Sequence, residues 1–265
     1  MGVGLLLKDY RQTRKLSQLE LSLEAEVSAR HISFLETGRS RPSRAVLLKL
    51  AQALDLSLRD TNVLLVSAGF NPHYPQRSLD DPAMQAVRQA LDFVLRNHAP
   101  FPAVVIDSDW NLLMANTPQL ELTRRLMSAQ PNWPQTTNVL ELLLDPNAFR
   151  PFVRNWEQLT KLLLRRRYRE ESFNPPAAGE ESLLERLLTY PDLPPSWRRQ
   201  DHDELEMPML TLELTVGNQQ LRCFSSIATF GTAVDITLQN LHIETYFPAD
   251  EETRRCFIEW ARQSS

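Results

Sequence analysis

The sequence predicts two domains of different classes. Residues 1–72 are predicted to form an all-α domain of five helices, and residues 83–265 an α+β domain with a five-stranded antiparallel sheet. Helix caps and stops follow one another at short intervals up to about residue 70, whereas apolar segments of strand length appear only after residue 100. Between them, "NPHYPQRSLDDP" is rich in proline and polar residues, so residues 73–82 are predicted to be a linker.

The helices of the first domain are predicted from their ends. "LLLKDYRQTRK" contains helix formers without a breaker. In "SQLELSLEAE", Ser17 and Glu20 have the spacing of a capping box. The helix after that begins at Ser28 and stops at Gly38. A fourth helix, "RAVLLKLAQAL", follows Pro42 and Ser43, and a fifth begins near Ser57 and runs to about Ala68.

The net charge of −4 hides an asymmetry between the two domains. Residues 1–75 hold ten Lys/Arg against seven Asp/Glu, whereas residues 76–265 hold nineteen against twenty-six. A basic domain attached to an acidic one is compatible with a DNA-binding module, although a difference of this size is also common by chance.

The third predicted helix has an unusual exposed face. At about 100° per residue, Ile32 and Leu35 define its buried side. Arg30 and Thr37 lie almost opposite, flanked by Ser33 and Phe34. A short turn before such a helix predicts a helix-turn-helix, whose second helix enters the major groove. Arg30 would then pair with guanine, Ser33 would offer a hydroxyl, and Phe34 would contact a thymine methyl. Alternatively, Phe34 packs against a neighbouring helix or a partner protein.

Residues 5–70 resemble the XRE family of helix-turn-helix regulators. The matching stretches are "R..RKLSQ.EL", "VS...ISFLE.G", "RPS" and "LLKLAQALDL". The resemblance implies a buried ion pair between Arg11 and Glu36. It also implies a phosphate contact from Gln18 and a position for Arg39, Ser40 and Arg41 along the DNA backbone. Glu26 departs from the family, which has a left-handed glycine in that turn. The full predicted DNA-binding set is Gln18, Ser28, Ala29, Arg30, His31, Ser33, Phe34, Thr37, Arg39, Ser40 and Arg41.

The second domain is predicted to begin with a helix near residues 83–98 and a hairpin over 102–116. Helices are then expected at about 117–128, 138–145, 148–171, 180–190 and 194–201, and strands over 209–216, 221–230 and 238–247. Two strands, several helices and three strands is the order of a PAS-like domain, in which helices cover one face of the sheet. The run "RRRYRE" at 165–170 is expected to be a solvated face.

This second domain resembles the ligand-binding domain of MmyB-like regulators, a branch of the XRE family. The resemblance rests on "PAVVIDSDWNLLMAN", "NVLELLLDP", Trp156 and "FGTAVDITLQNLHIETYFPADEET". It implies a long-chain fatty acid or related acyl ligand. An apolar cavity would suit such a chain, and an arginine at its mouth would suit a carboxylate. The predicted ligand-binding residues are Val105, Leu113, Leu140, Leu144, Phe152, Trp156, Leu159 and Phe224, with Arg154 and Arg222 for the head group. Alternatively, these residues are ordinary core and the domain serves only to dimerise or to dock a partner protein.

Other classes of function find little support in the sequence. Cys223 and Cys256 are the only cysteines, so neither a disulfide framework nor a zinc site is expected, and a reducing cytoplasm fits best. No apolar run approaches the length of a membrane span. Phosphate-binding loops and common catalytic motifs are missing, so neither catalysis nor a cofactor or metal is predicted. We therefore expect a homodimeric, ligand-sensing transcription regulator that binds double-stranded DNA. A protein-interaction adaptor or a constitutive repressor is the alternative.

Overall fold

The computed structural model describes residues 2–173, 181–199, 209, 211–231 and 233–263. The chain divides into two compact units. The N-terminal unit comprises Met1–Met84 together with Phe230–Gln239, and the C-terminal unit comprises Gln85–Thr229 together with Asn240–Ser265. The inclusion of residues 230–239 in the N-terminal unit was not predicted from the sequence.

Five helices form the main part of the N-terminal unit, as predicted. Ser17 and Glu20 form the predicted capping box: the Glu20 N–H donates to the Ser17 hydroxyl at 3.1 Å, and the Ser17 N–H donates to Glu20 Oε2 at 2.7 Å. Ser28, Ser43 and Ser57 cap the next three helices through the same backbone position. The helices are α1 (Val3–Thr13), α2 (Gln18–Ala25), α3 (Ala29–Glu36), α4 (Arg44–Ala53) and α5 (Leu58–Ser67).

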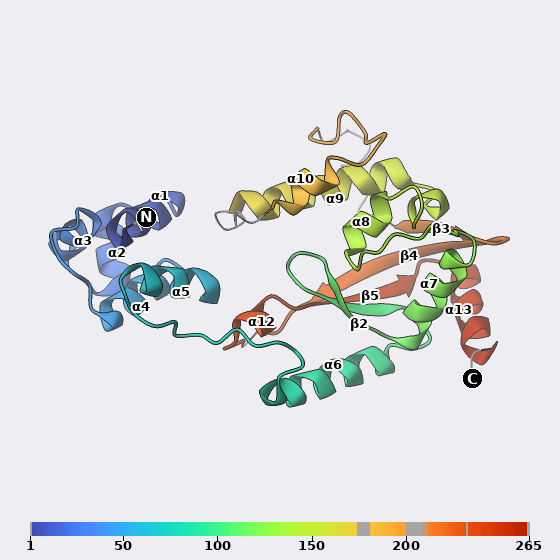
Figure 1. Cartoon of the computed structure of the whole chain (residues 1–265), viewed down its shortest axis with the longest axis horizontal. Coiled ribbons are helices and arrows are strands. Elements are labelled where there is room, and N and C mark those ends of the chain that lie inside the picture. Colours follow the sequence, from blue (N-terminus) through green and yellow to red (C-terminus); the bar gives the residue numbers. More distant parts are fainter. Residues whose placement is uncertain (1, 174–180, 200–208, 210, 232, 264–265) are drawn as a thin grey trace. The chain divides into compact units, whose positions relative to one another are not determined.

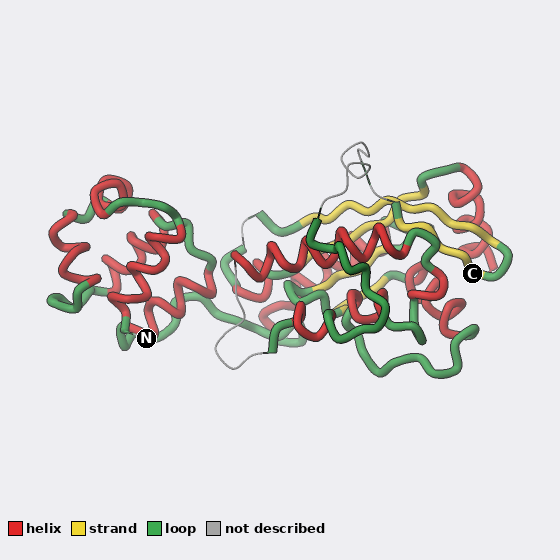
Figure 2. Tube along the Cα trace, turned by 90° about the horizontal axis from the view of Figure 1, so that it is seen from above, coloured by secondary structure: helices red, strands yellow, loops and turns green. Residues whose placement is uncertain are grey.

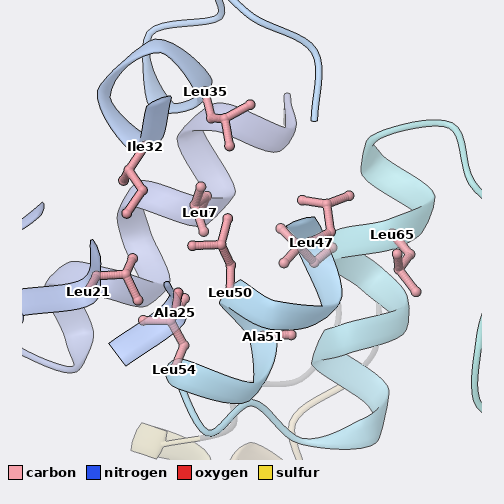
Figure 3. Close-up of a cluster of buried hydrophobic side chains, with 11 residues drawn as sticks. Leu7, Leu21, Ala25, Ile32, Leu35, Leu47, Leu50, Ala51, Leu54 and Leu65 are labelled. Atoms are coloured by element: carbon pink, nitrogen blue, oxygen red, sulfur yellow. The ribbon is translucent and has the colours of Figure 1, made fainter. Parts of the chain in front are cut away.

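The apolar faces of these helices meet in one core, shown in Figure 3. Ile32 and Leu35 of α3 point into this core, as their spacing predicted, and are at most 2% exposed. The other buried members are Leu7, Leu21, Ala25, Leu47, Leu50, Ala51, Leu54, Leu64 and Leu65. Because α3 gives its apolar side to this core, its opposite side remains on the surface.

The turn between α2 and α3 has the strained residue that the sequence indicated. Glu26 ends α2 with φ 53° and ψ 40°, in the left-handed region. A side chain in that region costs on the order of 1 kcal/mol relative to glycine. The only ion pair of Glu26 among the described residues is with Lys49, at 3.2 Å between two exposed side chains, and such a pair contributes little.

We therefore expect Glu26→Gly to raise the free energy of unfolding of the N-terminal unit by roughly 1 kcal/mol. Glu24→Gly, at an exposed position inside α2, is the matched control and should lower it by about 0.5–1 kcal/mol. Chemical denaturation followed by far-UV circular dichroism measures both changes. Equal destabilisation by the two glycines would show that the left-handed turn is not strained.

The C-terminal unit is built on the predicted five-stranded antiparallel sheet (Figures 1 and 2). The strand order is β2-β1-β5-β4-β3, so β2 and β3 form the two edges. The strands are β1 (Ala103–Ile106), β2 (Leu112–Ala115), β3 (Leu212–Val216), β4 (Gln219–Ala228) and β5 (His242–Pro248).

Helices cover both faces of this sheet, whereas the sequence predicted that they cover only one. Pairing of Val104 with Glu244, and of Glu244 with Ile227, places these three side chains on one face. Val104 belongs to the core cluster that holds residues of α8 (Val139–Leu144), α9 (Trp156–Phe173) and α10 (Leu183–Leu187). We use the name helix-covered face for this face alone. On the opposite face Ala103 and Val105 are fully buried, and α6 (Gln85–Asn97) packs on β1.

The helices of the C-terminal unit differ from the prediction in three places. The predicted helix over 148–171 is interrupted, because residues 153–155 separate a short 3-10 turn from α9. Residues 194–199 form turns rather than a helix, and the rest of that predicted segment lies outside the described residues. A C-terminal helix, α13, was not predicted. The helices are α6 (Gln85–Asn97), α7 (Thr117–Met127), α8 (Val139–Leu144), η2 (Arg150–Phe152), α9 (Trp156–Phe173), α10 (Leu183–Leu187) and α13 (Glu251–Gln263). Within residues 2–173, 181–199, 209, 211–231 and 233–263, no helix is long and apolar enough to cross a membrane.

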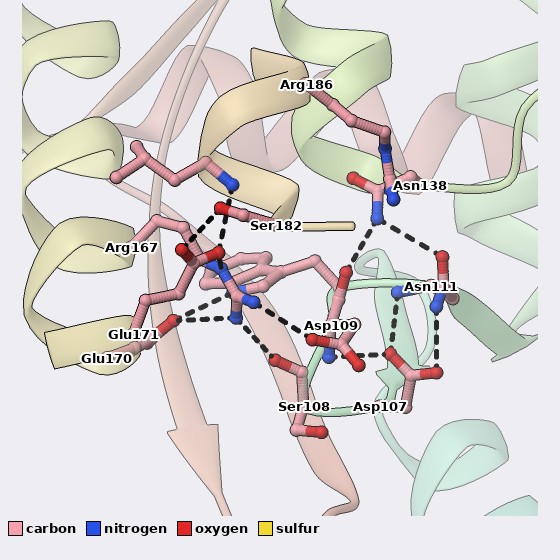
Figure 4. Close-up of polar contacts among 12 residues, drawn as sticks. Asp107, Ser108, Asp109, Asn111, Asn138, Arg167, Glu170, Glu171, Ser182 and Arg186 are labelled. Atoms are coloured by element: carbon pink, nitrogen blue, oxygen red, sulfur yellow. Dashed lines mark hydrogen bonds and ion pairs between the residues drawn. The ribbon is translucent and has the colours of Figure 1, made fainter. Parts of the chain in front are cut away.

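Within the arginine run of α9, Arg167 belongs to a buried polar network rather than to a solvated face (Figure 4), whereas Tyr168 and Arg169 are exposed as predicted. Arg167 is only 7% exposed. Its guanidinium donates to the Ser108 carbonyl and to Asp109 Oδ1, both at 3.0 Å, and to Glu171 Oε1 at 2.9 Å. Glu171 in turn accepts from the Ser182 hydroxyl at 2.6 Å. The network therefore ties the β1–β2 turn, α9 and the start of α10 together.

Candidate functional site

The exposed face of α3 is the candidate nucleic-acid interface. Arg30 is exposed and its guanidinium carbon lies 5.3 Å from the centre of the Phe34 ring, one helical turn further on. Phe34 is half-buried, so part of its side chain remains accessible. The Thr37 hydroxyl donates to the Ser33 carbonyl at 2.7 Å and so is satisfied within the helix. The face combines one cation, an aromatic ring and hydroxyl groups.

All eleven predicted DNA-binding residues lie in the N-terminal unit, and ten of them lie in α3, its N-cap or the loop that follows. Gly38, whose φ is 73°, turns the chain into the loop that follows α3. The Arg39 N–H of this loop donates to the Phe34 carbonyl at 2.8 Å. Ser28, Arg30, Thr37, Arg39 and Arg41 are exposed, whereas Gln18, Ala29, His31, Ser33, Phe34 and Ser40 are half-buried.

The end of α3 is held by the ion pair that the family resemblance implied. Arg11 donates through Nε to Glu36 Oε1 at 2.7 Å and through Nη2 to Glu36 Oε2 at 2.9 Å. A third Arg11 nitrogen donates to the Leu16 carbonyl at 2.7 Å. Gln18 donates through its amide nitrogen to Glu36 Oε2 at 2.9 Å, so one of its two amide hydrogens is engaged inside the domain. The other hydrogen remains for the predicted phosphate contact.

Gly4 sets how closely α1 approaches α3. A Cβ atom at Gly4 would overlap the carbonyl oxygen of Leu35 and would lie 2.8 Å from that of Glu36. Both oxygens are backbone atoms, so they cannot move away without shifting α3.

We therefore expect Gly4→Ala to lower the free energy of unfolding of the N-terminal unit by about 1–3 kcal/mol. Gly2→Ala is the control, because a Cβ at Gly2 has no neighbour within 4 Å. Thermal denaturation followed by circular dichroism would show the difference, and equal midpoints for the two variants would contradict the close approach.

In the C-terminal unit, five of the predicted ligand-binding residues lie in the helix-covered core. Leu140, Leu144 and Trp156 belong to the cluster that packs on Val104 and Ile106. Phe152 and Leu159 pack against the adjoining cluster around β3, β4 and α13, and Trp156 contacts both clusters. These residues supply an aliphatic and aromatic interior.

The other predicted ligand-binding residues lie elsewhere. Val105 and Phe224 are on the opposite face of the sheet, because their neighbours Val104 and Cys223 occupy the helix-covered face. Leu113 lies beside the irregular pairing of β1 and β2 and is 41% exposed. The structure therefore does not bring the ten predicted residues into one site.

The two arginines predicted for a ligand head group share a protein carboxylate. Arg222 Nε lies 3.4 Å from Glu213 Oε1, and Arg154 Nη1 lies 4.0 Å from Glu213 Oε2. Arg154 also donates to Gln220 Oε1 at 2.9 Å. Arg222 pairs with Glu213 across β3 and β4, on the face opposite the helix-covered core. This arrangement does not support a head-group role for either arginine at the mouth of that core.

A surface cavity of about 270 Å³ is present in another part of the C-terminal unit. It contains none of the ten predicted residues. Its lining includes the aromatic residues Phe257 and Trp260 of α13 and the polar residues Thr117 and Glu121 of α7. The Glu121 carboxylate is already paired with Arg124 at 2.8 Å and Arg125 at 2.7 Å.

The most unusual polar group of the helix-covered face was missed by the sequence analysis. Glu244 of β5 is 6% exposed, and its Oε2 has no hydrogen-bond partner among the described residues. Burial raises the pKa of its carboxyl, while Ser225, Tyr246 and the charge of Arg166 act in the opposite direction. The alternation of "HIETYF" places Glu244 on the same face as Tyr246, and that pattern was the available signal.

Comparison with known families agrees with this architecture. Residues 87–257 match the model of the MmyB-like transcription regulator ligand binding domain, which is more than half of the chain. The chain belongs to the MmyB-like transcription regulators. Residues 7–60 match the Helix-turn-helix family model, which includes α3 and the turn before it. This MmyB-like regulator is thus a DNA-binding transcription regulator with a helix-turn-helix domain followed by a ligand-binding domain.

Two of the similar proteins match less than a quarter of the chain. The MmyB-like regulator is 35% identical over 63 residues to Multiprotein-bridging factor 1 of Candida albicans; the match covers 24% of this chain and 42% of that protein, less than half of its length. It is 30% identical to the restriction-modification controller protein C.AhdI from Aeromonas hydrophila, over 22% of this chain and 89% of that chain, with a TM-score of 0.22. An RNA-binding Light-Oxygen-Voltage receptor is 11% identical; the match covers 99% of this chain and 61% of that chain, with a TM-score of 0.29.

Proposed function

We propose that α3 binds in the major groove of duplex DNA. The observation that carries this proposal is the exposed Arg30 stacked over Phe34, on the side of α3 away from the core. Arg30 pairs with guanine, Ser33 offers its hydroxyl to a base, and Phe34 contacts a thymine methyl beside that guanine. The exposed side chains of Arg39 and Arg41 follow the phosphate backbone.

The regulator is proposed to act as a homodimer. One recognition helix reads only a few base pairs, so two helix-turn-helix domains are needed for a long specific site. A two-fold dimer would read two half-sites about 34 Å apart or a multiple of that distance. The operator is therefore expected to be palindromic.

The C-terminal domain is proposed to bind a small apolar ligand, a fatty acid or an acyl derivative. The aliphatic and aromatic side chains of the helix-covered core support this, because each buried methylene of an acyl chain contributes about 0.8 kcal/mol. The ligand can change DNA binding only through its different affinities for two arrangements of the regulator. Native mass spectrometry of the purified chain, followed by organic extraction, tests the ligand class. A co-purified acyl species supports it, and binding of only non-acyl molecules in a ligand screen would overturn it.

We expect Arg30→Ala to weaken DNA binding by about 1–3 kcal/mol and to relax the preference for guanine at one position of each half-site. Arg59→Ala removes an exposed arginine of α5, outside the proposed interface, and serves as the control. Binding to a selected duplex, measured by fluorescence anisotropy at several salt concentrations, gives both affinity and salt dependence. Equal losses for the two variants would place the interface elsewhere.

A protein-interaction adaptor is the second candidate, and the match to a multiprotein-bridging factor favours it. Salt dependence separates the two functions. A DNA reader loses affinity for duplex DNA steeply as salt rises, because bound phosphates release counterions. Binding to a partner protein without any salt-dependent affinity for DNA would favour the adaptor.

A further inference from the structure

The connection between β4 and β5 is part of the N-terminal unit. We refer to residues 230–239 as the clip. The clip belongs to the same compact unit as Met1–Met84, although both of its ends continue into strands of the C-terminal unit. It contains the short helix α12 (Ile236–Gln239), and Ile236 is 3% exposed. The sequence had predicted the last part of this segment as the beginning of a strand.

Hydrogen bonds and an ion pair hold the clip to the chain that follows α5. Arg77 Nη1 lies 3.0 Å from Asp235 Oδ2, and Asp235 is 4% exposed. The Ile236 N–H donates to the Pro75 carbonyl at 2.9 Å. The buried carboxylate and the buried apolar side chain show that this is a packed contact.

The chain after α5 is itself held to α5. Asn62 accepts from the N–H groups of His73 at 2.7 Å and Tyr74 at 3.0 Å, and donates to the Tyr74 carbonyl at 2.7 Å. The first residues of the predicted 73–82 linker are therefore folded on α5. They form a bridge between that helix and the clip.

The clip also completes the N-terminus of α5 directly. Leu58 is the first residue of this helix, and its N–H has no partner within the helix. The side-chain oxygen of Gln239 accepts this N–H at 3.0 Å. Helix α5 packs on α1 and α4. By accepting the Leu58 N–H, the clip therefore supports a helix that is part of the helix-turn-helix domain.

The ends of the clip are fixed by strand pairing. Ala228 of β4 pairs with Ile243 of β5, so the chain leaves and returns at neighbouring positions of the ladder. The chain passes between the two units after residues 84, 229 and 239. A shift of β4 relative to β5 would therefore move the two ends of the clip relative to each other.

We propose that the clip is the mechanical link through which a change in the five-stranded sheet of the C-terminal unit reaches the helix-turn-helix domain. Movement of β4 against β5 pulls on α12, weakens the Gln239 cap and the Arg77–Asp235 pair, and loosens α5. The link depends only on how the two units are connected, so it stands or falls independently of the ligand class and of the DNA contacts.

Hydrogen exchange of the amides of α5 in the full chain tests whether the clip holds this helix. We expect Asp235→Ala to speed exchange of residues 58–67 about tenfold, because it leaves Arg77 without its carboxylate. Val234→Ala changes a clip residue that is 72% exposed and should leave exchange unaltered. Unaltered exchange in Asp235→Ala would overturn the proposal.

A second comparison separates transmission from mere support. Ile243→Ala removes a 7% exposed side chain of β5, next to the clip, and should speed α5 exchange several-fold through the intact clip. Three glycines inserted after Thr229 and three after Gln239 should keep the clip on α5 but abolish this response. If Ile243→Ala does not fold, Ile243→Val takes its place. The same response with and without the insertions would show that the clip transmits nothing.

Discussion

Arg11→Met is expected to lower the free energy of unfolding of the N-terminal unit by about 3–5 kcal/mol. Arg11 and Glu36 are 9% and 7% exposed, and they share two hydrogen bonds. Methionine fills much of the space but leaves the Glu36 carboxylate with only the amide of Gln18. Because Glu36 ends α3, the recognition helix loses its anchor and DNA binding should fall with stability.

All five tryptophans lie in the C-terminal unit, so tryptophan fluorescence does not report this change. Hydrogen exchange of the amides of residues 29–36 measures the change in stability of the N-terminal unit instead. Arg14→Met is the control, since Arg14 pairs at 3.5 Å with an Asp55 side chain that is 91% exposed, and such pairs contribute less than about 1 kcal/mol. A change of under 1 kcal/mol in Arg11→Met would contradict the role of the buried pair.

The same variant should alter the dependence of stability on pH. Burial alone raises the pKa of Glu36, but hydrogen bonds from Arg11 and Gln18 and the charges of Arg11 and Lys8 bring it below its usual value. A lowered pKa in the folded state gives stability that is present above the ordinary pKa and lost as pH falls. Without Arg11, the effect of burial on the pKa of Glu36 is less opposed, so this pKa should rise. We therefore expect the loss of stability at acid pH to become smaller or to reverse.

Glu244→Met is expected to raise the free energy of unfolding of the C-terminal unit by roughly 1–3 kcal/mol at neutral pH. Glu244 is buried with one carboxyl oxygen unpartnered, and an apolar side chain of similar volume removes the cost of burying that group. This gain is expected to outweigh the hydrogen bonds with Ser225 and Tyr246 that are lost with the carboxyl. Urea denaturation followed by tryptophan fluorescence measures the change. Glu259→Met, at an exposed position of α13, is the control and should change stability little.

The raised pKa of Glu244 gives this prediction a second signature. Burial is the main cause of the shift. A raised pKa in the folded state means that stability is fully present below the ordinary carboxyl pKa and falls as pH rises through the raised value. Glu244→Gln cannot ionise, so this fall should disappear while the size of the side chain is kept. A wild-type protein whose C-terminal unit gains stability over that range would refute the raised pKa of the buried carboxyl.

Local signals allowed the N-terminal domain to be predicted almost completely. A cap such as Ser17 with Glu20 joins residues three apart, so the sequence contains the whole interaction. The core and exposed faces of α3 follow from helical periodicity in the same way. The Arg11–Glu36 pair joins residues twenty-five apart, and it was implied only by the family resemblance. The C-terminal helix α13 had comparable signals in Asp250, Glu251 and Glu252, and they were overlooked.

The sequence by itself thus determined the five helices of the first domain, the face of α3 that meets solvent, and the five strands of the second domain. Only the tertiary structure decided which face of the sheet each strand residue occupies, that Glu213 draws Arg154 and Arg222 together, and that the β4–β5 connection joins the N-terminal unit. The physical reason is the range of the interactions. Caps and periodic faces depend on neighbours within a few residues, whereas Arg77–Asp235 and Leu58–Gln239 join residues 158 and 181 positions apart.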